Sequence, residues 1–245
     1  MDLKEEAAIS GDPSHHWYYI SKGRAIKSLL DGQRADAMLD VGAGSGVFSR
    51  MLLQEGVCNR ATCVDPNYSN AWLEQTNDVP IGFTRSVGAV DASLVLMIDV
   101  VEHVDDDKGL IREYAKKADI GTRFLISAPA FQFLWSSHDT FLEHRRRYTE
   151  GDLEATVRAA GLQPLKSRYF FGLLFPAAVA LRAMDRALKG KGEASRSALK
   201  TAPDWLNKTL VAIHDVERIA LLPFNRIAGV TVFCLAEKRT DGIFD

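Results

Sequence analysis

Cysteine is scarce in this sequence, and an excess of charge of one sign is missing. The three cysteines, Cys58, Cys63 and Cys234, lack the spacing of a zinc site and lie in or beside apolar runs. We therefore expect reduced, buried thiols in a cytoplasmic protein. The 30 basic and 32 acidic residues give a net charge of -2, so no nucleic-acid partner is expected.

Long hydrophobic runs are absent as well. Residues 1–10 are acidic and contain no apolar core of signal-peptide length, which predicts that the protein is not exported. The apolar run at 169–181 contains Pro176 and falls short of the roughly 20 residues that a bilayer-spanning helix needs. With 47% apolar residues in a chain of 245, we expect a globular protein with a large core.

Short apolar runs alternate with helical patterns over the first 170 residues. The predicted strands cover residues 37–41, 61–65, 81–84, 93–99 and 122–128, and a last strand covers 229–237. The predicted helices in this part of the chain cover 47–54, 69–76, 106–118 and 149–161. This order predicts an α/β fold in which helices cover both faces of a parallel sheet.

A glycine-rich turn follows the first predicted strand, which ends at Asp40. The segment 42–46 reads Gly-Ala-Gly-Ser-Gly, so consecutive backbone N–H groups and a helix N-terminus face a ligand at the carboxyl edge of the sheet. The dinucleotide fingerprint would need a glycine at Val47, which disfavours NAD and FAD. Asp65 ends the second strand and can accept hydrogen bonds from both hydroxyls of a ribose.

These residues resemble the class I S-adenosylmethionine-dependent methyltransferases over about 15–170. The resemblance implies a Rossmann-like fold with a seven-stranded, mostly parallel sheet, S-adenosylmethionine as cofactor and S-adenosylhomocysteine as product. It also implies that Asp40 lies against the methionine part of the cofactor and that Asp65 holds the ribose. The predicted cofactor-binding residues are Arg24, Asp40, Gly42, Ala43, Gly44, Ser45, Gly46, Asp65, Pro66, Met97 and Asp99.

A narrower resemblance concerns the N-terminal segment. His16-Trp17-Tyr18-Tyr19 before Arg24 is similar to the opening of a bacterial subgroup of these enzymes, the methyltransferase types 11, 12 and 23. In that subgroup an N-terminal helix closes over the cofactor, so Arg24 is a candidate partner of its carboxylate. The alternative is a solvated arginine beside aromatic core residues.

The expected parts of the chain are an N-terminal helical cap (1–35), a methyltransferase core (36–168 and 229–239) and a helical insertion or lid before the last strand (169–228).

The segments 129–139 and 144–149 concentrate aromatic residues, two histidines and three arginines at the mouth of the sheet. His138 and His144 are the predicted catalytic residues, because a neutral imidazole can accept a proton from a hydroxyl as it is methylated. The alternative is that both histidines tie down a long loop. One or two arginines are expected to bind an anionic group of the substrate. The predicted substrate-contacting residues are Trp135, Arg145, Arg146 and Tyr148.

The segment from Asp99 to His103 resembles the acid-x-x-Glu-His metal segment of ubiquinone-pathway O-methyltransferases, with aspartate in place of glutamate. Asp99, Glu102 and His103 could therefore bind a divalent ion that orients a substrate hydroxyl. Metal-free relatives carry a similar Glu-His pair, so we do not favour a metal. In the favoured alternative, Glu102 and His103 cap and brace the next helix.

The sequence thus predicts a methyltransferase that methylates oxygen in a small-molecule, sugar or lipid-linked acceptor, because histidines suit a hydroxyl. A catalytically silent S-adenosylmethionine-binding regulatory protein is one alternative, and an NAD-dependent oxidoreductase, disfavoured by Val47, is another. We expect a cytoplasmic location. A peripheral contact with the inner membrane face through 169–188 is the alternative.

Overall fold

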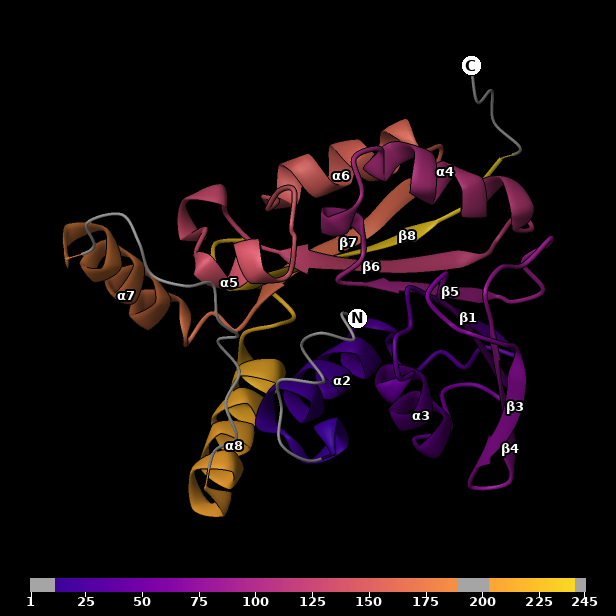
Figure 1. The fold of residues 1–245 in the computed structure, drawn as a ribbon, viewed down its shortest axis with the longest axis horizontal. Helices are drawn as coiled ribbons and strands as arrows, with labels where there is room; N and C mark the ends of the chain where they lie inside the picture. Colours follow the sequence, from indigo (N-terminus) through magenta and orange to yellow (C-terminus); the bar gives the residue numbers. More distant parts are fainter. Residues whose placement is uncertain (1–11, 189–202, 241–245) are drawn as a thin grey trace.

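The computed structural model describes residues 12–188 and 203–240. The start of the expected cap (1–11) and the middle of the expected insertion (189–202) lie outside the described residues. The described chain forms an α/β fold in which one sheet separates two helical layers (Figure 1). The fold class predicted from the sequence is confirmed.

The sheet has eight strands in the order β3-β4-β2-β1-β5-β6-β8-β7. The strands β4, β2, β1, β5 and β6 are parallel, whereas β3 and β8 run antiparallel to their neighbours. The central strand β5 is buried at every position, as a strand covered on both faces must be. The strands are β1 (Met38–Val41), β2 (Ala61–Val64), β3 (Trp72–Thr76), β4 (Val79–Thr84), β5 (Leu94–Ile98), β6 (Arg123–Pro129), β7 (Gln163–Phe170) and β8 (Thr231–Glu237).

Two apolar clusters fill the space between the sheet and its helices. One cluster joins the sheet to α2 and α3 through residues such as Tyr19 and Phe48, and the other joins it to α4 and α6. The buried cysteines belong to these clusters and are free thiols, as expected. The helices are α2 (Trp17–Leu29), α3 (Val47–Gln54), α4 (Asp107–Lys117), α5 (Ser137–Phe141), α6 (Glu150–Ala159), α7 (Phe175–Leu188) and α8 (Asp204–Ala220), and the 3-10 turns are η1 (Pro13–His15), η2 (Val101–His103) and η3 (Gln132–Leu134).

The helix predicted at 69–76 is wrong, because this segment forms β3 and gives the sheet eight strands instead of seven. Asn77 and Asp78 both have positive φ, at 50° and 63°, which is the backbone of a two-residue hairpin. The indole of Trp72 then stacks on the Phe83 ring of β4 with the centroids 4.4 Å apart. Cross-strand aromatic packing therefore outweighs the local helical pattern.

The predicted helical insertion before the last strand is confirmed, and its helix α8 packs against the N-terminal helix α2 (Figure 1). The side chain of Asn207 accepts a hydrogen bond from the Trp17 backbone N–H (2.7 Å) and donates to the His15 carbonyl (2.9 Å). Arg218 donates to the Ser28 hydroxyl (3.1 Å). The two helices thus lie on the same side of the sheet as one unit. No helix in the described ranges has the length and apolar character needed to cross a membrane.

Candidate active site

The glycine turn between β1 and α3 has a backbone that only glycine adopts readily. Gly42, Gly44 and Gly46 have φ values of +66°, +56° and +73°. A Cβ atom on Gly42 would lie 2.7 Å from a methyl carbon of Val100, which is closer than a carbon contact allows. The turn therefore has no room for a side chain at Gly42, because Val100 fills the space that a Cβ atom would need.

Two buried acids, Asp40 and Asp65, flank this turn. Asp40 accepts a hydrogen bond from the Ser49 hydroxyl (2.7 Å), and its burial raises the pKa of the carboxyl to about 6. Asp65 accepts a hydrogen bond from the backbone N–H of Gly44 (3.2 Å), while Tyr68 Oη donates to the Gly44 carbonyl (2.5 Å). Carboxylates have about four acceptor positions, so both acids retain capacity for a ligand.

The end of β5 carries an ion pair that the sequence did not reveal. Lys22 of α2 is fully buried and donates hydrogen bonds to Asp99 and to Tyr18 Oη. Tyr18 Oη and Ser127 Oγ also donate to Asp99, at 3.2 and 2.9 Å. Burial alone would raise the pKa of Asp99, but the Lys22 ammonium and the Ser127 hydroxyl hold it below its ordinary value. The helix α2 is thereby fixed over the end of the sheet.

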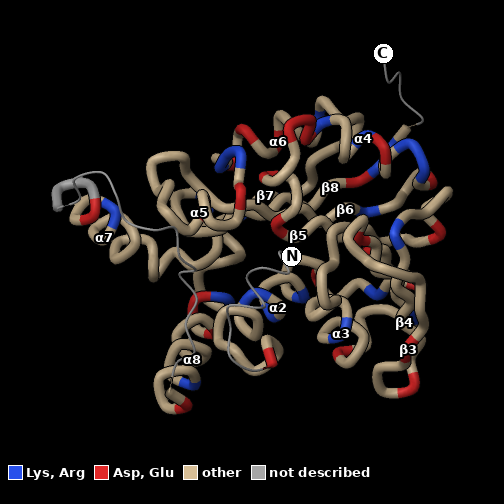
Figure 2. Tube along the Cα trace, in the orientation of Figure 1, with Lys and Arg blue, Asp and Glu red and all other residues tan. Residues whose placement is uncertain are grey.

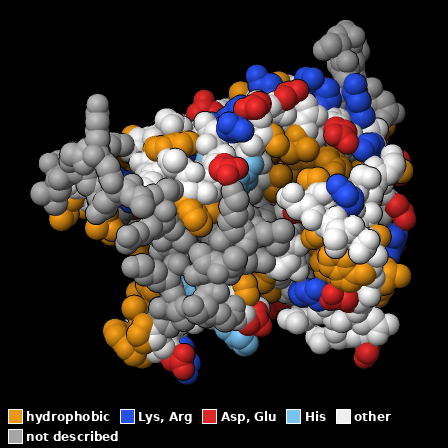
Figure 3. All heavy atoms as spheres, in the orientation of Figure 1, with side chains coloured by type: hydrophobic (Ala, Val, Ile, Leu, Met, Phe, Trp, Pro, Cys, Tyr) orange, Lys and Arg blue, Asp and Glu red, His pale blue; other side chains and the backbone are white. Residues whose placement is uncertain are grey.

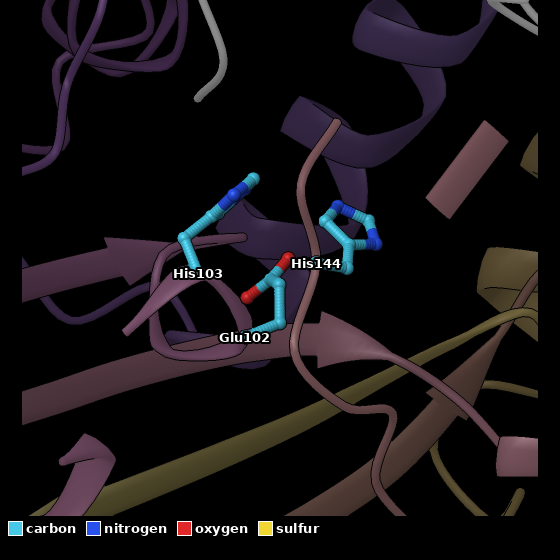
Figure 4. A group of neighbouring side chains, drawn as sticks. All are labelled: Glu102, His103 and His144. Carbon is cyan, nitrogen blue, oxygen red and sulfur yellow. The ribbon is translucent and has the colours of Figure 1, made fainter. Parts of the chain in front are cut away.

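A second group, the Glu102–His103–His144 cluster, lies beside this pair. One ligand atom from each residue falls within 4.8 Å of the others. The Glu102 carboxylate points between the two imidazole rings, whose centroids are 4.8 Å apart (Figure 4). Glu102 is completely buried. Its burial, together with the negative charge of Asp99, raises the pKa of its carboxyl well above the ordinary value.

The His144 ring is held by Asp139, a fully buried residue of α5. His144 Nδ1 lies 2.9 Å from Asp139 Oδ1, and the Arg147 guanidinium donates to both carboxylate oxygens at 2.7 and 2.9 Å. Burial alone would raise the pKa of Asp139, but the hydrogen bonds from His144 and Arg147 hold it well below its usual range. Asp139 also closes the capping box of α5 with Ser136, so the acid, the imidazole and the helix start are fixed together.

A cavity of about 180 Å³ at the carboxyl edge of the sheet is lined by Asp99, by the Glu102–His103–His144 cluster and by Arg147. Aromatic residues of α2 and the start of the insertion form one wall, with Trp17, Tyr18 and Phe171 among them. The acidic, basic and imidazole residues of the lining are Asp99, Glu102, His103, His138, His144, Arg147 and Arg182. The cavity therefore combines a water-excluding aromatic wall with several groups that can bind protons or charge.

Both predicted catalytic histidines line this cavity, but the predicted substrate residues lie outside its lining. Tyr148 is buried and donates to Asp107 (2.7 Å), and Arg146 pairs with the same acid (3.2 Å). Arg145 is half-exposed and lies 3.6 Å from Asp105. The half-buried Trp135 is also absent from the lining. Tyr148, Arg146 and Arg145 are thus each paired with an acidic residue of the protein, and Arg147 and Arg182 are the arginines in the cavity lining.

The predicted cofactor residues lie in different parts of the structure. The glycine turn, Asp40 and Asp65 gather at the ends of β1 and β2, and Asp99 lines the cavity. Met97 is buried in the core behind them. Arg24 pairs with Asp215 of α8 and stays outside the cavity lining. That pairing depends on the inserted helix, and no local pattern in the sequence indicates it.

The glycine turn after β1, the acid after β2 and the sheet order define the class I methyltransferase architecture, and solved structures share this fold. A sarcosine dimethylglycine methyltransferase assigned in Galdieria sulphuraria aligns with a TM-score of 0.54 and 13% identity, over 90% of this chain and 86% of that chain. A chain from the Haloferax volcanii complex of the Trm112 methyltransferase activator with a methyltransferase aligns with a TM-score of 0.53 and 17% identity, over 91% and 95%. At these identities the likeness shows the fold alone.

A family model described as a methyltransferase domain matches residues 16–167. The chain belongs to this family and is a class I S-adenosylmethionine-dependent methyltransferase. No curated protein sequence matches the chain significantly. The residues around the turn fit the cofactor: the glycines hold a left-handed backbone that other residues rarely adopt, and two buried carboxylates offer acceptors for an ammonium group and for ribose hydroxyls.

Proposed function

We propose that this enzyme methylates a hydroxyl oxygen of an acceptor bound in the cavity. The observation that carries the proposal is the imidazole and carboxylate lining beside the end of β5. An oxygen nucleophile must lose its proton during methyl transfer, and a cavity imidazole can accept that proton. An amine or thiol acceptor needs less help of this kind.

The cofactor supplies an electrophilic methyl group when it is bound, and the residues supply alignment. Asp40 binds the amino group of the methionine part, Asp65 binds the ribose hydroxyls, and the turn 42–46 offers backbone N–H groups. The aromatic wall of α2 excludes water from the reacting atoms. His138 and His144, both in the cavity lining, are the imidazoles that we propose as acceptors of the proton.

The affinity for S-adenosylmethionine is expected to fall as the pH drops below about 6, the pKa of Asp40. The amino group of the cofactor is cationic and binds only the ionised carboxylate, so protonation competes with binding. The dissociation constant should then rise about tenfold for each pH unit below that pKa. Calorimetry against pH measures this slope. The Asp40→Asn variant should bind weakly and without the slope, and a flat wild-type profile would argue against this role of Asp40.

We further propose that the acceptor carries an apolar portion and an anionic group. Hydrophobic side chains are exposed around α7 and α8 (Figure 3), including Leu173, Leu181 and Met184 at 48%, 57% and 55%. Acidic and basic residues are interspersed along the described ranges (Figure 2), so the exposed apolar side chains around α7 and α8, and not an excess of one charge, are the basis of this proposal. Arg182 of α7 lines the cavity beside this surface and supplies a guanidinium for a phosphate or carboxylate. A peripheral membrane contact through 169–188 would present such an acceptor.

Transfer of labelled methyl groups from S-adenosylmethionine into cell extracts tests both proposals. The lipid fraction, presented in vesicles, is expected to take up most of the label as methyl ether. The Asp65→Ala variant serves as the control, because it should lose cofactor binding and label nothing. Label on nitrogen or sulfur would overturn the proposed oxygen chemistry, and label confined to water-soluble acceptors would overturn the lipid-linked acceptor.

A further inference from the structure

Glu102 is a buried carboxylate whose two oxygens have no hydrogen-bond partner in the described part of the chain. Buried carboxylates are normally paired, because burial of an uncompensated polar group is costly. The nearby acid Asp99 is paired with Lys22, so of these two acids Glu102 is the one without a hydrogen-bond partner. Its oxygens are directed toward a polar space at the cavity (Figure 4).

The imidazole rings of His103 and His144 border this space. One ring nitrogen of His103 and one of His144 lie with a Glu102 oxygen in a group whose atoms are within 4.8 Å of one another. Such spacing brings all three atoms within reach of one central ion after small side-chain movements. Two imidazoles and one carboxylate form a donor set suited to zinc, iron or another divalent transition metal, whereas magnesium prefers oxygen ligands.

The surroundings of His144 match those of a metal ligand. Its Nδ1 atom lies 2.9 Å from Asp139, which Arg147 holds on the other side. A metal-binding imidazole commonly uses its second nitrogen in this way, because the bond fixes the ring orientation and the tautomer. The Nε2 atom is therefore the one available to an ion.

We propose that Glu102, His103 and His144 hold one divalent transition-metal cation at the wall of the cavity. Three protein ligands leave coordination positions for the acceptor hydroxyl, whose pKa the ion would lower. Asp99, which the sequence placed in the donor set, is replaced by His144, because Lys22 already neutralises it. His144 is then a ligand, and His138 is the cavity imidazole left to accept the proton. This inference rests on the proposed hydroxyl methylation.

The test starts from full-length protein freed of metal by a chelator. Titration with Co²⁺ should give one equivalent of binding and visible absorption bands of imidazole ligation, and Zn²⁺ should displace it. The Glu102→Gln and His144→Gln variants should each bind at least about 100-fold more weakly, while His138→Gln and the surface variant His15→Gln should bind like the wild type. Circular dichroism checks the fold of each variant.

Absence of stoichiometric binding by the wild type overturns the metal site, whatever the variants do. Equal binding by correctly folded Glu102→Gln overturns it as well. The proposed function fails separately. If the chelator-treated enzyme methylates a hydroxyl acceptor at the full rate, the metal proposal is wrong and the oxygen chemistry stands. If the protein binds the metal tightly but methylates only nitrogen, the proposed oxygen chemistry is wrong.

Discussion

The Lys22→Met variant is expected to lose about 3–5 kcal/mol of its free energy of unfolding. The Lys22 side chain is fully buried and neutralises Asp99, whose side chain is only 24% exposed. Methionine fills a similar volume but leaves Asp99 without its counter-charge, beside the second buried acid, Glu102. The expected loss is therefore the cost of an uncompensated buried charge and not of a missing contact.

Urea unfolding measures the loss, and the chain offers a matched control. Lys27 lies on the same helix and pairs with Glu55, but both side chains are about half-exposed, at 45% and 50%. The Lys27→Met variant should change the stability by less than about 1 kcal/mol. The double variant Lys22→Met with Asp99→Asn should recover much of the loss, because it removes the stranded charge. Equal effects of Lys22→Met and Lys27→Met would contradict this account.

The parallel core of the sheet could be predicted from the sequence because its strands are short apolar runs bounded by turns. The strand β5, for example, consists only of apolar residues and is buried throughout. The segment 69–76 could not be assigned in the same way. Its strand depends on the stacking of Trp72 on Phe83, a contact that exists only after the Asn77-Asp78 turn has formed. The pattern of apolar residues along the segment gives no indication of that contact.

The residues of the candidate site likewise differ in whether the sequence reveals them. The glycine turn and Asp65 are local features, so the sequence displays them at fixed spacings. Lys22 carries no such signal, since a lysine four residues after Tyr18 is ordinarily a solvated side chain. Three consecutive arginines likewise look equivalent in the sequence. The structure separates them, because Arg147 alone reaches the buried Asp139 and lines the cavity.

The Asp139→Asn variant is expected to lose about 3–5 kcal/mol of unfolding free energy and to methylate its acceptor roughly 10–100-fold more slowly. The Asp139 carboxylate is fully buried and is the counter-charge of Arg147, whose side chain is 6% exposed. Asparagine keeps the size but leaves that guanidinium buried without a negative charge. It also presents an uncharged amide to His144 Nδ1, so the imidazole loses its fixed orientation at the cavity wall.

Asp139 acts through His144 and is a positioning residue, so activity alone does not test its role. The rate of methyl transfer should fall at saturating acceptor and at a temperature well below unfolding, while the affinity for S-adenosylmethionine stays unchanged, because the glycine turn lies outside this cavity lining. The Asp91→Asn variant is the control: it makes the same change in an exposed pair with Arg60, at 87% side-chain exposure, and should match the wild type. A stable Asp139→Asn enzyme with wild-type turnover would show that His144 needs no carboxylate to hold it.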